Sequence, residues 1–107
     1  MIIAVPVTPD GQVDPRWGRA ARVAVARVDD GQIAAWHEHD VDWDELHDVG
    51  TEGGHHARIA RFVIDQGITT VVANHMGPPM VQMLGQMGIV VRLGAAGSAR
   101  LAVTGAG

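Results

Sequence analysis

The chain has 107 residues, of which 47% are hydrophobic and 19% are charged, a composition typical of one globular domain and not of a disordered segment. The net charge of −4, with eight arginines spread along the chain and no lysine, argues against nucleic acid binding and excludes lysine-dependent chemistry. The absence of cysteine excludes disulfide bonds, a thiol nucleophile and metal sites with protein thiolate ligands.

The first apolar run predicts a buried strand. Residues 2–7 are continuously apolar over the length of a strand, and Pro9 and Gly11 follow at once. The run is too short for a membrane span and lacks the basic segment of a signal peptide. We therefore expect a cytoplasmic protein without a membrane partner.

The next part of the chain predicts a loop and a hairpin. Residues 8–19 contain several proline, glycine and aspartate residues, which favour a long loop. Residues 22–28 and 32–39 are rich in strand-forming side chains, and the Asp30-Gly31 pair between them is a strong hairpin signal. Two antiparallel strands therefore follow the first strand.

The second half of the chain predicts alternating helices and strands. An acidic, turn-rich stretch precedes the first long helix, which ends at a glycine, and an apolar strand follows each of the two long helices. Ser98 is the expected N-cap of a short last helix. The predicted segments are the acidic stretch 40–54, a helix over 54–66, a strand over 68–73, a helix over 78–87, a strand over 89–93, and a last helix that frays over 104–107.

These elements predict a single α/β domain over residues 1–107. The order strand-strand-strand-helix-strand-helix-strand-helix opens with a hairpin and continues with right-handed crossovers, which gives a mixed five-stranded sheet with flanking helices. Four of the strands then end, and both long helices begin, at one edge of the sheet. Ligands bind at this carboxyl edge in open α/β sheets.

Six histidines lie in the middle of the chain, and the predicted topology places all of them at the ligand edge. Neutral imidazole binds zinc, copper, nickel and iron, so their convergence would form a transition-metal site. Helical phase turns His56 inward and His55 outward. His56 and His75 are the first ligand candidates, and His37, His39 and His55 would support them; the alternative is that these histidines are solvated loop residues. The six are His37, His39, His47, His55, His56 and His75.

Two loops carry candidate ligand-binding side chains. Pro78 and Pro79 remove two backbone donors after the fourth strand, so we do not expect a phosphate cradle there. The side chains of Asn74 and His75 would then carry recognition, or would only cap local backbone. In the first loop, Trp17 is either a lid over the site or, as we favour, a hydrophobic anchor.

Two further patterns favour structural interpretations. The methionines and the leucine of residues 80–87 have the spacing of a helix face packed on a sheet, which argues against soft copper ligation. The carboxylates of the acidic stretch favour a solvated loop, because no pair of them follows the first strand as two-metal catalysis would require.

Short motifs along almost the whole chain resemble one known family. The motifs are IIAVPV at 2–7, RWGRA at 16–20, the DDG hairpin at 29–31, ITTVVA at 68–73 leading to MGP at 76–78, and MGIVV at 87–91. They resemble the dinitrogenase iron-molybdenum cofactor biosynthesis family, the small NifX/NifY-type domain that is also found fused to NifB. The resemblance implies a ribonuclease H-like fold without the nuclease carboxylates. It also implies a protein that binds or carries iron-sulfur or iron-molybdenum clusters and is not an enzyme, with a cluster donor or acceptor protein as its partner.

The chain departs from the family pattern in two loops. The first loop of the family commonly reads His-Phe-Gly-Arg-Ala, whereas this chain has Arg16 and Trp17 in the first two places, so an expected ligand is missing. The loop after the fourth strand, usually small and glycine-rich, carries His75 instead. We therefore expect the ligand set to be this chain's own. The expected cofactor contacts are Trp17, Arg19, Asn74, His75 and Gly77.

Two functions remain open. As a carrier, the chain would hold an iron-sulfur or iron-molybdenum cluster, or a histidine-ligated transition metal, and pass it to a partner. As an enzyme, it would use His75 as a general acid or base, or a histidine-bound metal, on a small molecule under the first loop. An enzyme needs an enclosed pocket with a base held by a second group, whereas a carrier can leave its ligands open to solvent. The free edge of the third strand would allow a homodimer.

Overall fold

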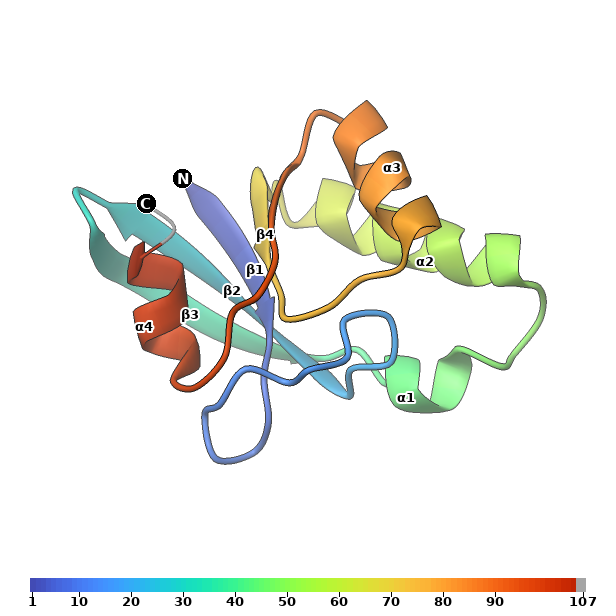
Figure 1. The fold of residues 1–107 in the computed structure, drawn as a ribbon, viewed down its shortest axis with the longest axis horizontal. Helices are drawn as coiled ribbons and strands as arrows, with labels where there is room; N and C mark the ends of the chain where they lie inside the picture. The colour runs from blue at the N-terminus through green and yellow to red at the C-terminus, as the bar shows by residue number, and fades with distance from the viewer. Residues whose placement is uncertain (106–107) are drawn as a thin grey trace.

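The computed structural model describes residues 1–105 as a five-stranded sheet with helices on both faces (Figure 1). The elements follow the predicted order, with one additional short helix before the first long helix. The predicted fraying of the last helix falls partly on residues 106 and 107, outside the described range. No helix in that range is long and apolar enough to span a membrane. The elements are β1 (Ile2–Pro6), β2 (Arg22–Asp29), β3 (Gln32–Asp40), α1 (Trp43–Leu46), α2 (Glu52–Asp65), β4 (Thr70–Val72), α3 (Pro78–Gln86), β5 (Val90–Arg92) and α4 (Ala99–Gly105).

The sheet is mixed, as predicted, with the strand order β3-β2-β1-β4-β5. β2 is antiparallel to both β1 and β3, whereas β1, β4 and β5 run parallel to one another. The turn between β2 and β3 uses Asp30 and Gly31 with φ values of 53° and 74°, the left-handed geometry of a tight hairpin turn. Because β1 and β4 are parallel neighbours, they end at the same edge of the sheet.

Apolar side chains cover both faces of the sheet. α2 and α3 pack on one face through residues that include Ile59, Val63 and Leu84, and α4 packs on the other through Ala99 and Val103. Strands buried on both faces need apolar residues at successive positions, which explains the continuous apolar runs of β1 and β4. The helices leave open the edge where β1 and β4 end.

The short helix α1 is the element that the sequence patterns missed. Asp42 precedes it with a left-handed φ of 54°, and the backbone N–H of Trp43 donates to the Ala20 carbonyl at 3.0 Å. The Trp43 side chain is buried in the core next to Trp17. An isolated helix of four residues is not stable in water, so these tertiary contacts determine α1.

One guanidinium group joins the ends of β2 and β3. Arg22 donates from Nε to Asp40 at 3.0 Å and from Nη1 to Glu38 at 3.2 Å. The hydrogen bond to Asp40 is the main reason that the pKa of Arg22 is raised, so the group stays charged. Solvent screens these exposed pairs, which makes their contribution to stability small. They orient the last residues of β3, which lead into α1.

Candidate functional site

A pocket of about 750 Å³ lies at the edge where β1 and β4 end. Five segments line it: the loop after β1, the turn between α1 and α2, the first turn of α2, the loop between β4 and α3, and the first turn of α3. This volume is within the usual range for small-molecule sites. The pocket is therefore the candidate functional site.

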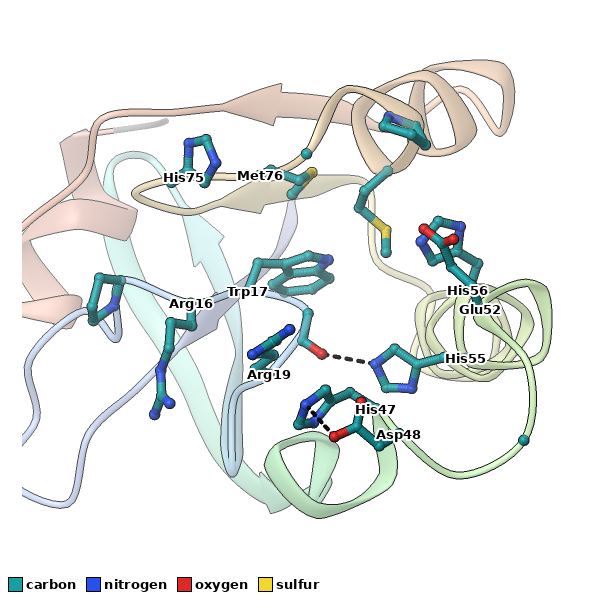
Figure 2. Close-up of a pocket in the computed structure, with 16 residues that line it drawn as sticks. Arg16, Trp17, Arg19, His47, Asp48, Glu52, His55, His56, His75 and Met76 are labelled. Carbon is teal, nitrogen blue, oxygen red and sulfur yellow. Dashed lines mark hydrogen bonds and ion pairs between the residues drawn. The ribbon is translucent and has the colours of Figure 1, made fainter.

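Four of the six histidines line this pocket, namely His47, His55, His56 and His75 (Figure 2). His37 and His39 do not. His39 packs on the ring of Phe62 with centroids 5.5 Å apart, and His37 is exposed on β3. His37 and His39, which were expected to support the ligands at this edge, are therefore not brought into the pocket. His39 is half-buried against Phe62 of α2.

The predicted orientations of His55 and His56 are also wrong. His55 is buried and only 6% exposed, and His56 is half-buried. An apolar helix face that includes Ile64 would turn His56 inward, whereas Ile64 is 65% exposed. The buried stripe of α2 runs through His55, Ile59 and Val63, at helical spacing of four residues.

Both ring nitrogens of His55 have partners. Nε2 lies 2.7 Å from the carbonyl oxygen of Gly18, the bond that the dashed line from His55 marks in Figure 2. Nδ1 lies 2.7 Å from Nη1 of Arg58, and the same Nη1 donates to the carbonyl oxygen of Leu46 at 3.2 Å. His55 therefore connects α2 to the loop after β1.

His47 is a pocket residue that was not among the candidate ligands. Its Nδ1 lies 3.2 Å from the Trp43 carbonyl oxygen, which accepts a hydrogen bond, and its Nε2 lies 3.1 Å from Oδ2 of Asp48. His47 follows α1 directly, and this helix turns the chain back toward the pocket. Recognition of α1 in the sequence would therefore have indicated His47. Asp48 and Glu52, expected only as part of a solvated loop, line the same wall.

Trp17 forms part of the pocket wall and belongs to the core. It is 1% exposed and meets Trp43 edge to face at 5.2 Å between centroids, which confirms the anchor interpretation. Its Nε1–H is buried without a partner among residues 1–105. An unpaired buried donor costs about 1–3 kcal/mol, and a buried indole N–H usually has a partner. In Figure 2 the nitrogen end of the ring points toward the α2 side of the pocket.

Of the three candidate residues in the loop after β4, two line the pocket and one does not. His75 and Gly77 line the pocket, and His75 is exposed. Asn74 does not line it, because its side-chain amide donates to the Ala95 carbonyl at 3.0 Å. Asn74 therefore binds the backbone of the loop after β5, which is neither the pocket contact nor the local cap that the sequence suggested. The backbones of Arg16 and His75 form a β-bridge, which brings the two loops together.

The charged side chains of the pocket are of both signs. We call residues 14–20 the Trp17 loop. This loop contributes Arg16 and Arg19, both exposed, and Arg16 lies 3.5 Å from the carboxylate of Asp14. Asp48 and Glu52 lie on the other side of the pocket. Asp48 belongs to the turn before α2, and Glu52 is the first residue of α2. The pocket therefore offers cationic N–H donors from the Trp17 loop.

The described residues contain no group of three or more histidines, aspartates or glutamates placed to hold a metal ion. Figure 2 shows His56 and His75 on opposite sides of Trp17. Within residues 1–105, the imidazoles thus surround a space and do not converge on one point. Such an arrangement fits a ligand of several atoms better than a single metal ion.

Comparisons with known proteins agree with this architecture. The family described as "Dinitrogenase iron-molybdenum cofactor" matches residues 1–106. No curated protein matches the chain significantly.

Three solved structures share the fold. The apo form of the orange protein (ORP) from Desulfovibrio gigas is 26% identical, with a TM-score of 0.76 over 95% of this chain and 82% of that one. PH0822 is 19% identical, with a TM-score of 0.74 over 99% of this chain and 88% of that one. TM1290 from Thermotoga, a proposed NifB protein of the DUF35 family, is 20% identical, with a TM-score of 0.61 over 95% of this chain and 83% of that one.

Proposed function

Because this chain belongs to the dinitrogenase iron-molybdenum cofactor family, we propose that it is a carrier that binds a metal cluster as cargo in the pocket and passes it to a partner protein. The observation that carries this proposal is the buried Nε1–H of Trp17, which has no partner in the described chain although it belongs to the pocket wall. A cargo with acceptor atoms on its surface would supply that partner.

The donor groups of the pocket suit a cluster. The sulfide or oxo atoms of an iron-sulfur or iron-molybdenum cluster accept hydrogen bonds, and a chain without cysteine can hold such a cluster by N–H donors, imidazoles, carboxylates or methionine thioethers. Arg16 and Arg19 add positive charge on the side of the Trp17 loop. This chemistry favours a cargo that is anionic where it faces the loop.

Two imidazoles are our candidate metal ligands. His56 and His75 line the pocket, and neither ring has a hydrogen bond to another described residue, so both are free to coordinate. Their positions on opposite sides of Trp17 require a cargo larger than one ion if both bind at once. This supports a cluster over a single histidine-ligated metal. His37 and His39 lie outside the pocket and have no role in this proposal.

The enzyme alternative has less support. A general base is normally oriented by a hydrogen bond to a second group. His75, the residue expected to act as acid or base, is exposed and has no such partner within residues 1–105. A solvent-open ligand is compatible with a carrier that must release its cargo.

Several finer expectations belong to the same proposal. The hairpin opening and the strand order support a ribonuclease H-like classification of the sheet. The partner would be a cluster donor or acceptor protein. A cytoplasmic location and a homodimer through the free edge of β3 remain predictions.

Anaerobic reconstitution tests the carrier proposal. Untagged protein is incubated with Fe²⁺ and sulfide, with and without molybdate, and metal per chain is measured by elemental analysis after gel filtration. We expect stoichiometric metal for the wild type and for His37→Ala, and reduced metal for His56→Ala and His75→Ala. Trp17→Phe keeps an aromatic side chain but removes the N–H, which should weaken binding by about tenfold or more. Failure of the wild type to retain metal under every condition would contradict the proposal.

A further inference from the structure

We propose that His55 is a positioning residue and not a metal ligand: its ring fixes the Trp17 loop against α2 and thereby sets the donors that face the cargo. This inference rests on the proposed function and assigns different roles to the two adjacent histidines of α2. His55 positions the pocket wall, and His56 binds the cargo. The sequence alone had assigned both to the metal.

The two partners of His55 determine its tautomer. The carbonyl oxygen of Gly18 can only accept a hydrogen bond, so Nε2, at 2.7 Å, carries the proton. The guanidinium of Arg58 can only donate, so Nδ1, at 2.7 Å, is unprotonated. His55 is therefore a neutral imidazole with both nitrogens engaged. A metal at either nitrogen would displace one of these partners.

Arg58 extends this connection to a third segment. Its Nη1 also donates to the carbonyl oxygen of Leu46, the last residue of α1, at 3.2 Å. The chain of bonds runs from Leu46 through Arg58 and His55 to Gly18. The end of α1, the first half of α2 and the Trp17 loop are thus joined through two side chains, of which His55 is buried and Arg58 half-buried.

Gly18 links this bond to the pocket. It lies between Trp17 and Arg19, and all three residues line the pocket. Gly18 has no side chain that could anchor this part of the loop, so its carbonyl is the group through which His55 acts. A shift of that carbonyl would move the indole N–H of Trp17 and the guanidinium of Arg19 together. The His55 bond therefore controls the arrangement of two proposed donors without touching the cargo.

His56 provides the matched comparison. It is adjacent in sequence, lines the same pocket and makes no hydrogen bond to another residue in the described part of the chain. A substitution there removes a candidate ligand but leaves the Gly18 connection in place. Glutamine should distinguish the two positions, because its amide can donate to the Gly18 carbonyl and accept from Arg58 but lacks the imidazole nitrogen that would coordinate a metal.

The tautomer can be measured without any cargo. In ¹⁵N-labelled wild-type protein, the long-range ¹H–¹⁵N spectrum of the imidazoles should show His55 as the neutral form protonated at Nε2. Addition of Zn²⁺ as the probe should shift ring nitrogens of His56 or His75 and leave those of His55 unchanged. A proton on Nδ1 in the free protein, or a metal-induced shift of a His55 ring nitrogen, would overturn the inference.

Variants then test the positioning role. After reconstitution with Fe²⁺ and sulfide, we expect His55→Gln to bind the cluster within about threefold of the wild type and His55→Ala to bind it about tenfold more weakly, which corresponds to the loss of about one hydrogen bond. His56→Gln should be as weak as His56→Ala. A His55→Gln protein that folds but binds as weakly as His55→Ala would identify His55 as a ligand instead.

Measurements on the ligand-free protein test the role of His55 independently of the carrier proposal. Backbone amide resonances of Trp17, Gly18 and Arg19 should move in His55→Ala and stay in place in His56→Ala. If neither the wild type nor any variant retains metal after reconstitution with Fe²⁺ and sulfide, the carrier proposal fails, while these shifts and the tautomer still decide the role of His55. If His55→Ala does not fold, the wild-type spectrum and His55→Gln decide it.

Discussion

The indole rings of Trp17 and Trp43 meet edge to face, with centroids 5.2 Å apart and planes at 72°. Trp43 continues the contact to Phe62 of α2, with centroids 5.6 Å apart. The wall of the pocket is thus one end of an aromatic cluster in the core. A change in the core at Trp43 should therefore reach the pocket.

Replacing Trp43 by leucine should lower the free energy of unfolding by about 2–4 kcal/mol, because it removes two aromatic contacts and leaves a cavity. Urea denaturation followed by circular dichroism measures this loss. Trp36→Leu is the control, since Trp36 is only half-buried and lies on the face that α4 covers. Equal losses in the two variants would contradict the importance of the Trp17–Trp43 contact.

Asp14 should hold the start of the Trp17 loop through one hydrogen bond. Its Oδ1 accepts the backbone N–H of Arg16 at 2.9 Å, and the residue is 6% exposed. Asp14→Ala should lower the free energy of unfolding by about 1–2 kcal/mol and speed amide exchange at Arg16. Asp14→Asn keeps the acceptor oxygen and should lose less than half as much. If both variants lose the same amount, the hydrogen bond is not the cause.

Thr51 should stabilise the helix that carries His55 and His56. It is the N-cap of α2, and its hydroxyl accepts the backbone N–H of Gly54 at 2.9 Å. Thr51→Ala should cost about 1 kcal/mol in unfolding free energy, whereas Thr51→Ser should cost only a few tenths. Chemical denaturation of the three proteins in parallel gives both differences.

The adjacent glycines of α2 should respond with opposite signs to alanine. A Cβ at Gly53 would meet no atom within 4 Å, so Gly53→Ala should raise the free energy of unfolding by about 0.5–1 kcal/mol through lower backbone entropy in the unfolded chain. A Cβ at Gly54 would lie 3.2 Å from the Thr51 hydroxyl oxygen, so Gly54→Ala should strain the cap and gain nothing. Thermal unfolding distinguishes them, and equal stabilisation at both positions would argue against the cap.

Local patterns were sufficient for most of the architecture. The apolar runs, the Asp30-Gly31 pair and the glycines behind the helices predicted the order of elements and the mixed sheet correctly. They missed α1, because a four-residue helix depends on where Trp43 is buried and not on its own propensity. They also misjudged the phase of α2, because Ile64 is apolar but exposed.

The sequence by itself determined that six histidines and no cysteine are available, and that the ends of β1 and β4 form the edge where a ligand would bind. Only the tertiary structure decided which imidazoles reach the pocket and which are already engaged. His55 meets Gly18 across 37 residues of sequence, and no periodicity within one helix encodes the position of a carbonyl in a distant loop. The orientation and tautomer of His55 follow from such contacts, which exist only once the sheet has brought the loops together.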